Sequence, residues 1–175
     1  MSRPPSRLAN PLLWLSTLTI GLMAGFFYAF AVLVMPALSR VDDKTFVITM
    51  QRINEGVQTG GFAFGFFGAF VFTTAAAIVQ AKMGRRAAAR WIIAAAILYL
   101  VALAVTFGGN IPLNNKLAAA GDPAQILDFA AARASFDEGA WVGLNAVRLV
   151  ASSLALLALV PALALTKRAE TPQVR

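Results

Sequence analysis

The chain has 175 residues, of which 59% are hydrophobic and 13% are charged, with a formal net charge of +7. Soluble globular domains contain about 45–50% apolar and about 25% charged residues, so this composition argues against a soluble enzyme and against a disordered chain. Cysteine and histidine are both absent. Their absence excludes disulfides, thiolate zinc sites, Fe–S clusters, His-ligated haem and catalytic triads that need histidine.

Four long stretches of the sequence carry almost no charge, and a helix needs about 20 apolar residues to cross a bilayer. We therefore predict an all-α fold, a single membrane domain over residues 1–175 that forms a four-helix bundle. The spans are expected at about 11–36, 57–81, 91–111 and 139–165. A soluble bundle would show polar helix faces, and segments such as residues 62–81 show none.

The first span could be mistaken for a signal peptide, because Ala29-Phe30-Ala31 resembles a cleavage site. Its apolar run is longer than a signal-peptide core and continues past that site, so we expect the span to be retained. Asp42 and Asp43 then stand where helix N-caps belong. Apolar residues follow at helical spacing and predict a helix that runs into the second span: Phe46, Met50, Ile53 and Val57.

The third and fourth spans are separated by a longer connection with signals of its own. Pro112 is expected to end the third span, because proline lacks the N–H that a helix interior needs. Asp122-Pro123-Ala124-Gln125 offers an N-cap, a proline at N1 and a glutamine at N3. These residues predict a short extra helix in the external loop between spans three and four.

The distribution of basic residues predicts the orientation in the membrane. Nine Lys and Arg residues flank the spans on the side of the two termini, and five lie on the opposite side together with seven of the eight acids. Cytoplasmic segments carry the excess of Lys and Arg, so we expect both termini in the cytoplasm. The positive charge is then a topology signal, with the lipid bilayer as partner, and no nucleic acid partner is expected.

Glycines recur at the spacing that lets helix backbones approach closely. The pairs are Gly21/Gly25, Gly61/Gly65 and Gly139/Gly143. They could form a homodimer face or pack within the four-helix bundle, and we favour packing within the bundle.

Arg148 lies inside the fourth span, about 15 Å from the outer end of that helix. A charge at this depth costs about 2.5–3.5 kcal/mol on insertion scales. We therefore expect the Arg148 side chain to face a bundle interior or wet cavity, to snorkel outward, or to pair with a buried carboxylate. Trp141, Asn145 and Arg148 share one helix face, and Asp137 or Glu138 begins the same stripe one turn above.

Other polar residues converge on the same outer half of the bundle. They are Arg52, Asn54, Glu55, Thr106, Asn110, Asn114 and Arg133. Polar groups on one side of an apolar bundle predict a pocket, and its arginines and amides suit a bound anion or a developing oxyanion. No metal site is expected, because the acids are scattered over the loops. The phenylalanines of the second span could bound a planar substrate, although such a run more often packs or faces lipid.

Several short motifs in this order resemble those of the anthrone oxygenase-like family of small integral membrane proteins. The motifs are Gly25-Phe26-Phe27-Tyr28, Met35-Pro36-Ala37-Leu38, Gln51-Arg52-Ile53-Asn54, Asn110-Ile-Pro-Leu-Asn114, Arg133…Phe136-x-x-x-x-Trp141 and Trp141-x-x-x-Asn145-x-x-Arg148. The family consists mostly of bacterial proteins of unknown function. Its fungal members oxidise polyketide anthrones to anthraquinones without a recognised metal or flavin.

The resemblance implies a cofactor-independent oxygenase of a lipophilic, phenolic or anthrone-like substrate, in a bacterial inner (cell) membrane. It implies that Asn54, Asn110, Asn114, Arg133 and Trp141 bind the substrate, with Arg148, Asn145 and Glu138 as the catalytic group. In this hypothesis Glu138 or Glu55 removes the methylene proton, and Arg148 with the asparagines stabilises the anion that reacts with dioxygen.

Two other interpretations remain open at this point. The protein could bind or transport a lipophilic anion, or act as an accessory subunit, without turnover. Alternatively, Arg148 could be purely structural and pair with an acid such as Glu138 to hold the bundle in register.

Overall fold

The computed structural model describes residues 9–170, and within this range it is all-helical, without strands, as predicted. Two five-residue π-helical turns, η1 and η2, interrupt the α-helices. The elements in chain order are α1 (Ala9–Ala29), η1 (Phe30–Val34), α2 (Met35–Leu38), α3 (Asp43–Gly56), α4 (Gly60–Lys82), α5 (Arg86–Val105), η2 (Thr106–Asn110), α6 (Ile111–Ala118), α7 (Phe129–Phe136) and α8 (Glu138–Glu170).

Four helical segments are long and apolar enough to cross a membrane: Ala9–Leu38, Gly60–Lys82, Arg86–Ala118 and Phe129–Lys167. Their outward faces expose large apolar side chains, including Leu33 at 66%, Leu157 at 62% and Ile97 at 59%. Soluble monomers do not present continuous apolar surfaces of this kind to water. The four segments therefore indicate a membrane protein.

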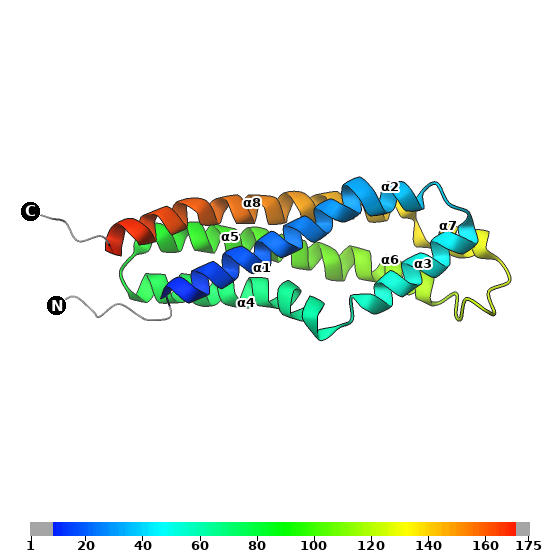
Figure 1. The fold of residues 1–175 in the computed structure, drawn as a ribbon, viewed down its shortest axis with the longest axis horizontal. Helices are drawn as coiled ribbons and strands as arrows, with labels where there is room; N and C mark the ends of the chain where they lie inside the picture. The colour runs from blue at the N-terminus through cyan, green and yellow to red at the C-terminus, as the bar shows by residue number, and fades with distance from the viewer. Residues whose placement is uncertain (1–8, 171–175) are drawn as a thin grey trace, which may run out of the picture.

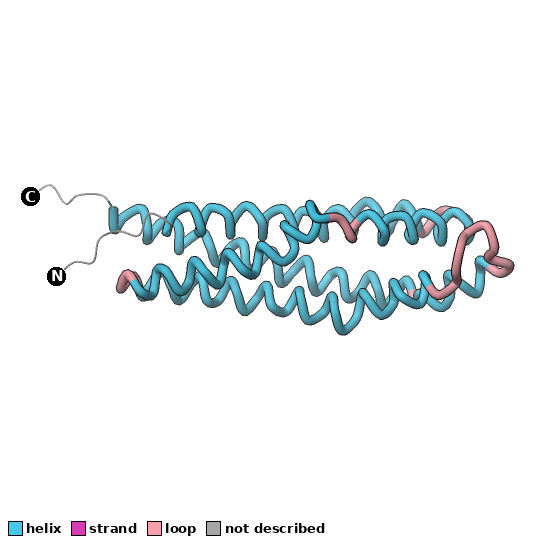
Figure 2. Tube along the Cα trace, turned by 90° about the horizontal axis from the view of Figure 1, so that it is seen from below, coloured by secondary structure: helices cyan, strands magenta, loops and turns pink. Residues whose placement is uncertain are grey.

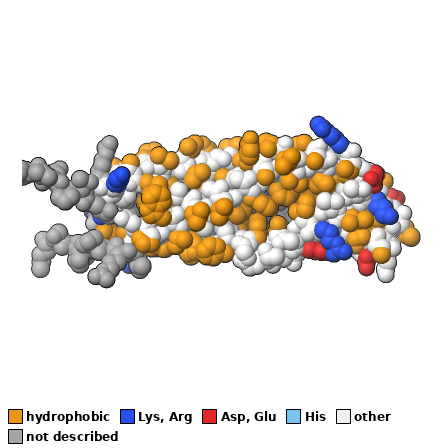
Figure 3. Space-filling model, in the orientation of Figure 1, with side chains coloured by type: hydrophobic (Ala, Val, Ile, Leu, Met, Phe, Trp, Pro, Cys, Tyr) orange, Lys and Arg blue, Asp and Glu red, His pale blue; other side chains and the backbone are white. Residues whose placement is uncertain are grey.

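The long helices run up and down between two ends of the bundle (Figure 1). We call one end basal: it contains the start of α1, the turn at residues 83–85 and the end of α8. The other, distal end contains α3, α6 and α7. Most loops lie at the distal end, and residues 57–59 break the helical run part-way along (Figure 2). On the face drawn in Figure 3, acidic side chains gather at the distal end and the middle lacks Lys, Arg, Asp and Glu.

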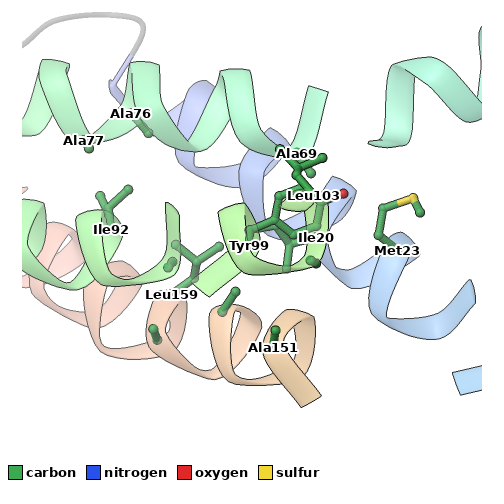
Figure 4. Packing of buried hydrophobic residues seen from close by; sticks show 14 of the residues in the cluster. Ile20, Met23, Ala69, Ala76, Ala77, Ile92, Tyr99, Leu103, Ala151 and Leu159 are labelled. Atoms are coloured by element: carbon green, nitrogen blue, oxygen red, sulfur yellow. The ribbon is translucent and has the colours of Figure 1, made fainter. Parts of the chain in front are cut away.

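The interior consists of two hydrophobic cores that follow one another along the bundle. The first joins α1, α4, α5 and α8, and Figure 4 shows Ile92, Tyr99 and Leu103 of α5 lying between α4 and α8. The second joins η1, α2, α3, α6, α7 and the start of α8, and includes the buried rings of Phe46 and Phe136. Asn145 and Arg148 of α8 lie where these two cores meet.

Pro112 does not end the third span, contrary to the prediction. The helix passes through η2 and continues as α6 to Ala118, with Pro112 in its first turn. Pro36 follows η1 in the same way. A π-helical turn shifts the backbone hydrogen bonds to i→i+5, which accommodates the proline ring and its missing N–H. The π-helical turns therefore allow both proline-containing segments to remain helical at the level of the polar cluster.

The connection between α6 and α8 contains a short helix, α7, which begins six residues later than the helix predicted there. Asp122 Oδ1 accepts from the N–H of Ala124 at 2.9 Å in a turn, and α7 is capped by Asp128, whose Oδ1 accepts from the N–H of Ala131 at 2.8 Å. Both aspartates are competent caps. Helix formation from Asp128 buries Ala132 and Phe136 in the distal core, which explains the later start.

The N-cap at Asp42 was predicted correctly, because Asp42 Oδ1 accepts from the N–H of Thr45 at 3.0 Å. Hydrogen bonds from the hydroxyl and then the N–H of Thr45 hold the pKa of Asp42 below its usual value. The predicted continuous run into the second span was wrong. α3 ends at Gly56, and Thr59 caps a separate helix, α4.

The glycine pairs were predicted either to pack within the bundle or to form a homodimer face, and the structure shows both inward-facing and outward-facing glycines. A Cβ on Gly65 would lie 3.5 Å from Met23 Sδ, and one on Gly21 would lie 3.9 Å from Leu156 Cδ1, so these two glycines face other helices of the bundle. Gly139 and Gly143 are exposed, and neither meets a side chain of another helix within 4 Å among the described residues. A homodimer through this outward pair stays a prediction.

Candidate functional site

The candidate site is a buried polar cluster between α8 and the α5–η2 helix, which pack extensively against each other. Helical spacing lines up Tyr99, Thr106 and Asn110 on one side. Trp141, Asn145, Arg148 and Ser152 line up on the other. All seven side chains are buried, and Arg148 is 5% exposed.

Arg148 points into the bundle and not out to a membrane surface. Its Nη2 donates to Asn145 Oδ1 at 2.9 Å, and its Nη1 donates to Thr106 Oγ1 at 3.5 Å. The guanidinium carbon lies 4.6 Å from the centre of the Phe27 ring and 5.1 Å from that of Trp141. These contacts are with neutral groups, and aromatic faces attract a desolvated cation.

No carboxylate of the described residues lies within salt-bridge distance of Arg148. Glu138 instead pairs with Arg133, with 3.0 Å between Oε2 and Nη2. The interpretation of Arg148 as one half of a structural ion pair with Glu138 is therefore not supported by this arrangement. The positive charge of Arg148 is buried without a compensating negative charge in the described part of the chain.

Asn145 connects Arg148 to the first span. Its Nδ2 donates to the backbone carbonyl of Phe27 at 3.0 Å, which fixes the amide so that Oδ1 faces the guanidinium. Phe27 precedes the π-helical turn η1 by three residues. One asparagine thus ties α1 and α8 together and sets the direction of the arginine.

Asn110 and Asn114 hold the indole ring on the distal side of the arginine. Asn110 Nδ2 donates to the carbonyl of Trp141 at 3.2 Å, and Trp141 Nε1 donates to Asn114 Oδ1 at 2.8 Å. The indole packs 5.5 Å from the ring of Phe30. The α5–η2–α6 helix therefore positions the aromatic wall beside Arg148.

Several buried polar atoms at this junction have no hydrogen-bond partner in the described structure. They include Arg148 Nε, Asn110 Oδ1 and Ser152 Oγ, and Asn54 Nδ2 of α3 is likewise unpaired at the distal side. Buried polar atoms are nearly always paired, with protein or with ordered water. The cluster thus has donors and an acceptor that a bound water or ligand could satisfy.

Arg133 and Glu138 lie outside this cluster, at the distal end. Arg133 Nη1 donates to the carbonyl of Val41 at 3.0 Å and to Asp43 Oδ1 at 3.1 Å, and its guanidinium lies 4.2 Å from the centre of the Phe46 ring. Because it also holds Glu138, Arg133 joins α3, α7 and α8. Glu138 is ten residues from Arg148, about 15 Å along the helix.

The remaining predicted residues lie on α3. Asn54 is half-buried, whereas Glu55 is exposed and pairs with Arg52 at 2.8 Å. The phenylalanines of α4 include both packing and outward-facing side chains: Phe66 is buried, and Phe64 and Phe67 are about half exposed on the outer face. The structure therefore brings together Asn110, Asn114, Trp141, Asn145 and Arg148, and keeps Arg133, Glu138 and Asn54 at its distal side.

Tyr99 was not among the predicted residues, although the sequence contains a signal for it. Tyr99 is fully buried, and its hydroxyl donates to the carbonyl of Phe66 at 2.9 Å, which links α5 to α4. It precedes Thr106 by seven residues, the spacing of two helical turns, and so shares its face.

A family model described as anthrone oxygenase matches residues 62–158, which is more than half of the chain. The matched segment contains every residue of the buried cluster and also Arg133 and Glu138, but not Asn54. No curated protein and no solved structure matches the chain. Because of the extent of the family match, the protein belongs to the anthrone oxygenase family.

Proposed function

We propose that the protein is a cofactor-independent oxygenase that converts a lipophilic anthrone-like phenol to a quinone within the membrane. Family membership supports the reaction class. The observation that carries the proposal is the buried guanidinium of Arg148, which has neutral neighbours and one unpartnered N–H. A buried charge without a counter-charge is costly, and an anionic ligand would relieve that cost.

The reaction needs an anion at this position. Loss of a methylene proton from an anthrone gives an anthrolate whose negative charge resides largely on oxygen. Arg148 stabilises that oxygen, and Asn145 holds Arg148 in place. Because the charge develops during proton removal, donors fixed in advance lower the barrier.

The anthrolate then reacts with dioxygen at the former methylene carbon and forms a hydroperoxide. Elimination of water from that carbon gives the second carbonyl of the quinone. One oxygen atom of O2 ends in the quinone and the other in water, and the substrate supplies all the electrons. The protein contributes orientation, electrostatic stabilisation and a proton acceptor.

We assign proton removal to Glu138. Arg133 holds its Oε2, and its Oε1 accepts no hydrogen bond from the described residues. Glu138 and Arg148 are ten residues apart on α8, about 15 Å along the helix. The proposed substrate therefore reaches from Arg148 to the distal end past Asn110 and Asn114.

The test is quinone formation from an anthrone by the purified protein under oxygen. Wild type should exceed both Arg148→Ala and protein-free detergent, and ¹⁸O2 should label one oxygen of the quinone. Equal rates in all three samples would overturn the enzyme proposal. Stoichiometric binding of the anthrone without product would favour the second candidate, a binding or transport protein for a lipophilic anion, which rests on the same arginine.

We also propose that the basal end faces the cytoplasm of a bacterial inner membrane, since the connections at that end carry most of the Lys and Arg residues. A cysteine introduced at exposed Arg86 should then react with an impermeant maleimide only after the cells are opened. A cysteine introduced at exposed Lys116 should react in intact cells. The reverse labelling pattern would contradict this orientation.

A further inference from the structure

A second site lies at the basal end of the bundle, away from the arginine cluster. A cavity of about 310 Å³ is lined by the first turns of α1 and the last turns of α8. Lys167, at its rim, is 19 residues from Arg148 in α8, so about 28 Å of helix separates the two sites. No part of the proposed oxygenase reaction uses this cavity.

The cavity has an apolar part and a polar part. Leu13, Trp14 and Leu163 line the apolar part, and Asn10, Thr166 and Lys167 line the polar part. Polar and apolar residues are offset along both helices: Asn10 precedes Leu13 at the start of α1, and Lys167 follows Leu163 at the end of α8. The polar part therefore faces the outside of the bundle end, and the apolar part faces the spans.

The cavity lies at the basal end of the first and fourth candidate spans, Ala9–Leu38 and Phe129–Lys167. Basic residues gather at this end, as expected where spanning helices meet lipid headgroups. Trp14 is 63% exposed, as expected for an aromatic residue at a membrane interface. The turn that follows Lys82 lies at the same end (Figure 1), and the basal side of the sequence carries nine basic residues and one acid.

We propose that this cavity binds an anionic phospholipid, with its phosphate at Lys167 and the upper part of an acyl chain against Trp14 and Leu163. Charge complementarity favours an anionic lipid over a zwitterionic one. The apolar wall favours a lipid over a free anion, because a free phosphate has no group to place against an indole and two leucines. Basic pockets between spanning helices at the cytoplasmic side commonly bind such headgroups.

The test is native mass spectrometry of the full chain in neutral detergent with equal amounts of phosphatidylglycerol and phosphatidylcholine. Wild type should retain phosphatidylglycerol on the order of fivefold more than phosphatidylcholine. Lys167→Gln should remove that preference. Lys82→Gln is the matched control, because it removes one basic charge at the same end but does not line the cavity, and it should keep the preference.

A second variant separates the apolar part from the charge. Ala164→Trp should fill the cavity, which Ala164 also lines, and reduce retention of both lipids severalfold while the charge is unchanged. Melting of each variant in phosphatidylcholine checks that it is folded. Equal retention of the two lipids by wild type, or an equal loss in Lys82→Gln and Lys167→Gln, would overturn the proposal. So would stabilisation by inorganic phosphate alone that matches that by phosphatidylglycerol.

Discussion

Arg148 and Asn145 form a unit, in which the asparagine oxygen accepts from the guanidinium at 2.9 Å while its nitrogen donates to the carbonyl of Phe27 at 3.0 Å. The arginine is therefore oriented by a neutral amide that is itself anchored on another span. A carboxylate in the same place would orient the arginine equally well, but it would neutralise the charge. The choice of an amide leaves the positive charge available to a ligand.

Introduction of a carboxylate beside Arg148 should therefore weaken anion binding. Thr106 contacts Arg148 Nη1, and aspartate is close to threonine in size. Thr106→Asp should form a buried ion pair, whereas Thr106→Asn has a similar shape without the charge. We expect the anthrolate, or an unreactive lipophilic phenolate, to bind Thr106→Asn at least about tenfold more tightly than Thr106→Asp. Equal affinities, measured by fluorescence titration, would show that the charge of Arg148 does not bind the anion.

Removal of the Asn145 side chain should destabilise the protein. Asn145→Ala leaves a guanidinium donor without its acceptor and removes the link between α8 and α1. An unpaired buried donor costs about 1–3 kcal/mol. Thermal unfolding in detergent measures the loss, and Asn115→Ala, at an exposed position of α6, is the control and should change stability little. A melting temperature for Asn145→Ala equal to that of the control would contradict the anchoring role.

The composition predicted four spans and an all-helical fold because charge-free stretches of this length have few other solutions. The polar face of α8 was predictable for a similar reason, since Trp141, Asn145 and Arg148 follow from helical period alone. The end of the third span was not predictable, because a proline such as Pro112 normally predicts the end of a helix. The π-helical turn η2, which directly precedes Pro112 and allows the helix to continue as α6, has no signal of its own in the sequence.

The partner of Glu138 was also beyond sequence reasoning. Glu138 lies on the same side of the predicted topology as several basic residues, and the sequence alone does not distinguish Arg148 from Arg133 as its partner. The fold decides between them, because α7 ends at Phe136 and Asp137 takes a left-handed conformation with φ of 53°. That turn brings Arg133 back over the first residue of α8.

Arg133 should hold the distal helices together. Its planar guanidinium contacts Val41, Asp43 and Glu138 at once, a geometry that a lysine cannot reproduce. Arg133→Lys should speed hydrogen exchange in α3 and α7 severalfold and leave α4 and α5 unchanged. Arg52→Lys is the matched control, because Arg52 forms only an exposed pair with Glu55, and exposed pairs contribute about 0–1 kcal/mol. Uniform acceleration over the whole chain would indicate global destabilisation instead.

Two adjacent glycines of η2 should respond in opposite ways to alanine. A Cβ on Gly109 would lie 2.7 Å from Leu144 Cδ1, which is too close, whereas one on Gly108 would meet nothing within 4 Å among the described residues. Overpacking costs about 1–3 kcal/mol, although Leu144 can relieve part of it by turning its side chain. Gly108→Ala should be neutral or slightly stabilising, because alanine has less backbone entropy to lose than glycine.

A double-mutant cycle identifies the cause of the Gly109 effect. If the clash with Leu144 is responsible, the Gly109→Ala and Leu144→Ala changes should be strongly non-additive in thermal unfolding, because the truncated side chain removes the contact. Leu144 is next to Asn145, so a displaced α8 should also reduce oxygenase activity in Gly109→Ala and not in Gly108→Ala. Additive effects would contradict the clash with Leu144 as the cause. They would mean instead that the π-helical backbone itself requires glycine at position 109.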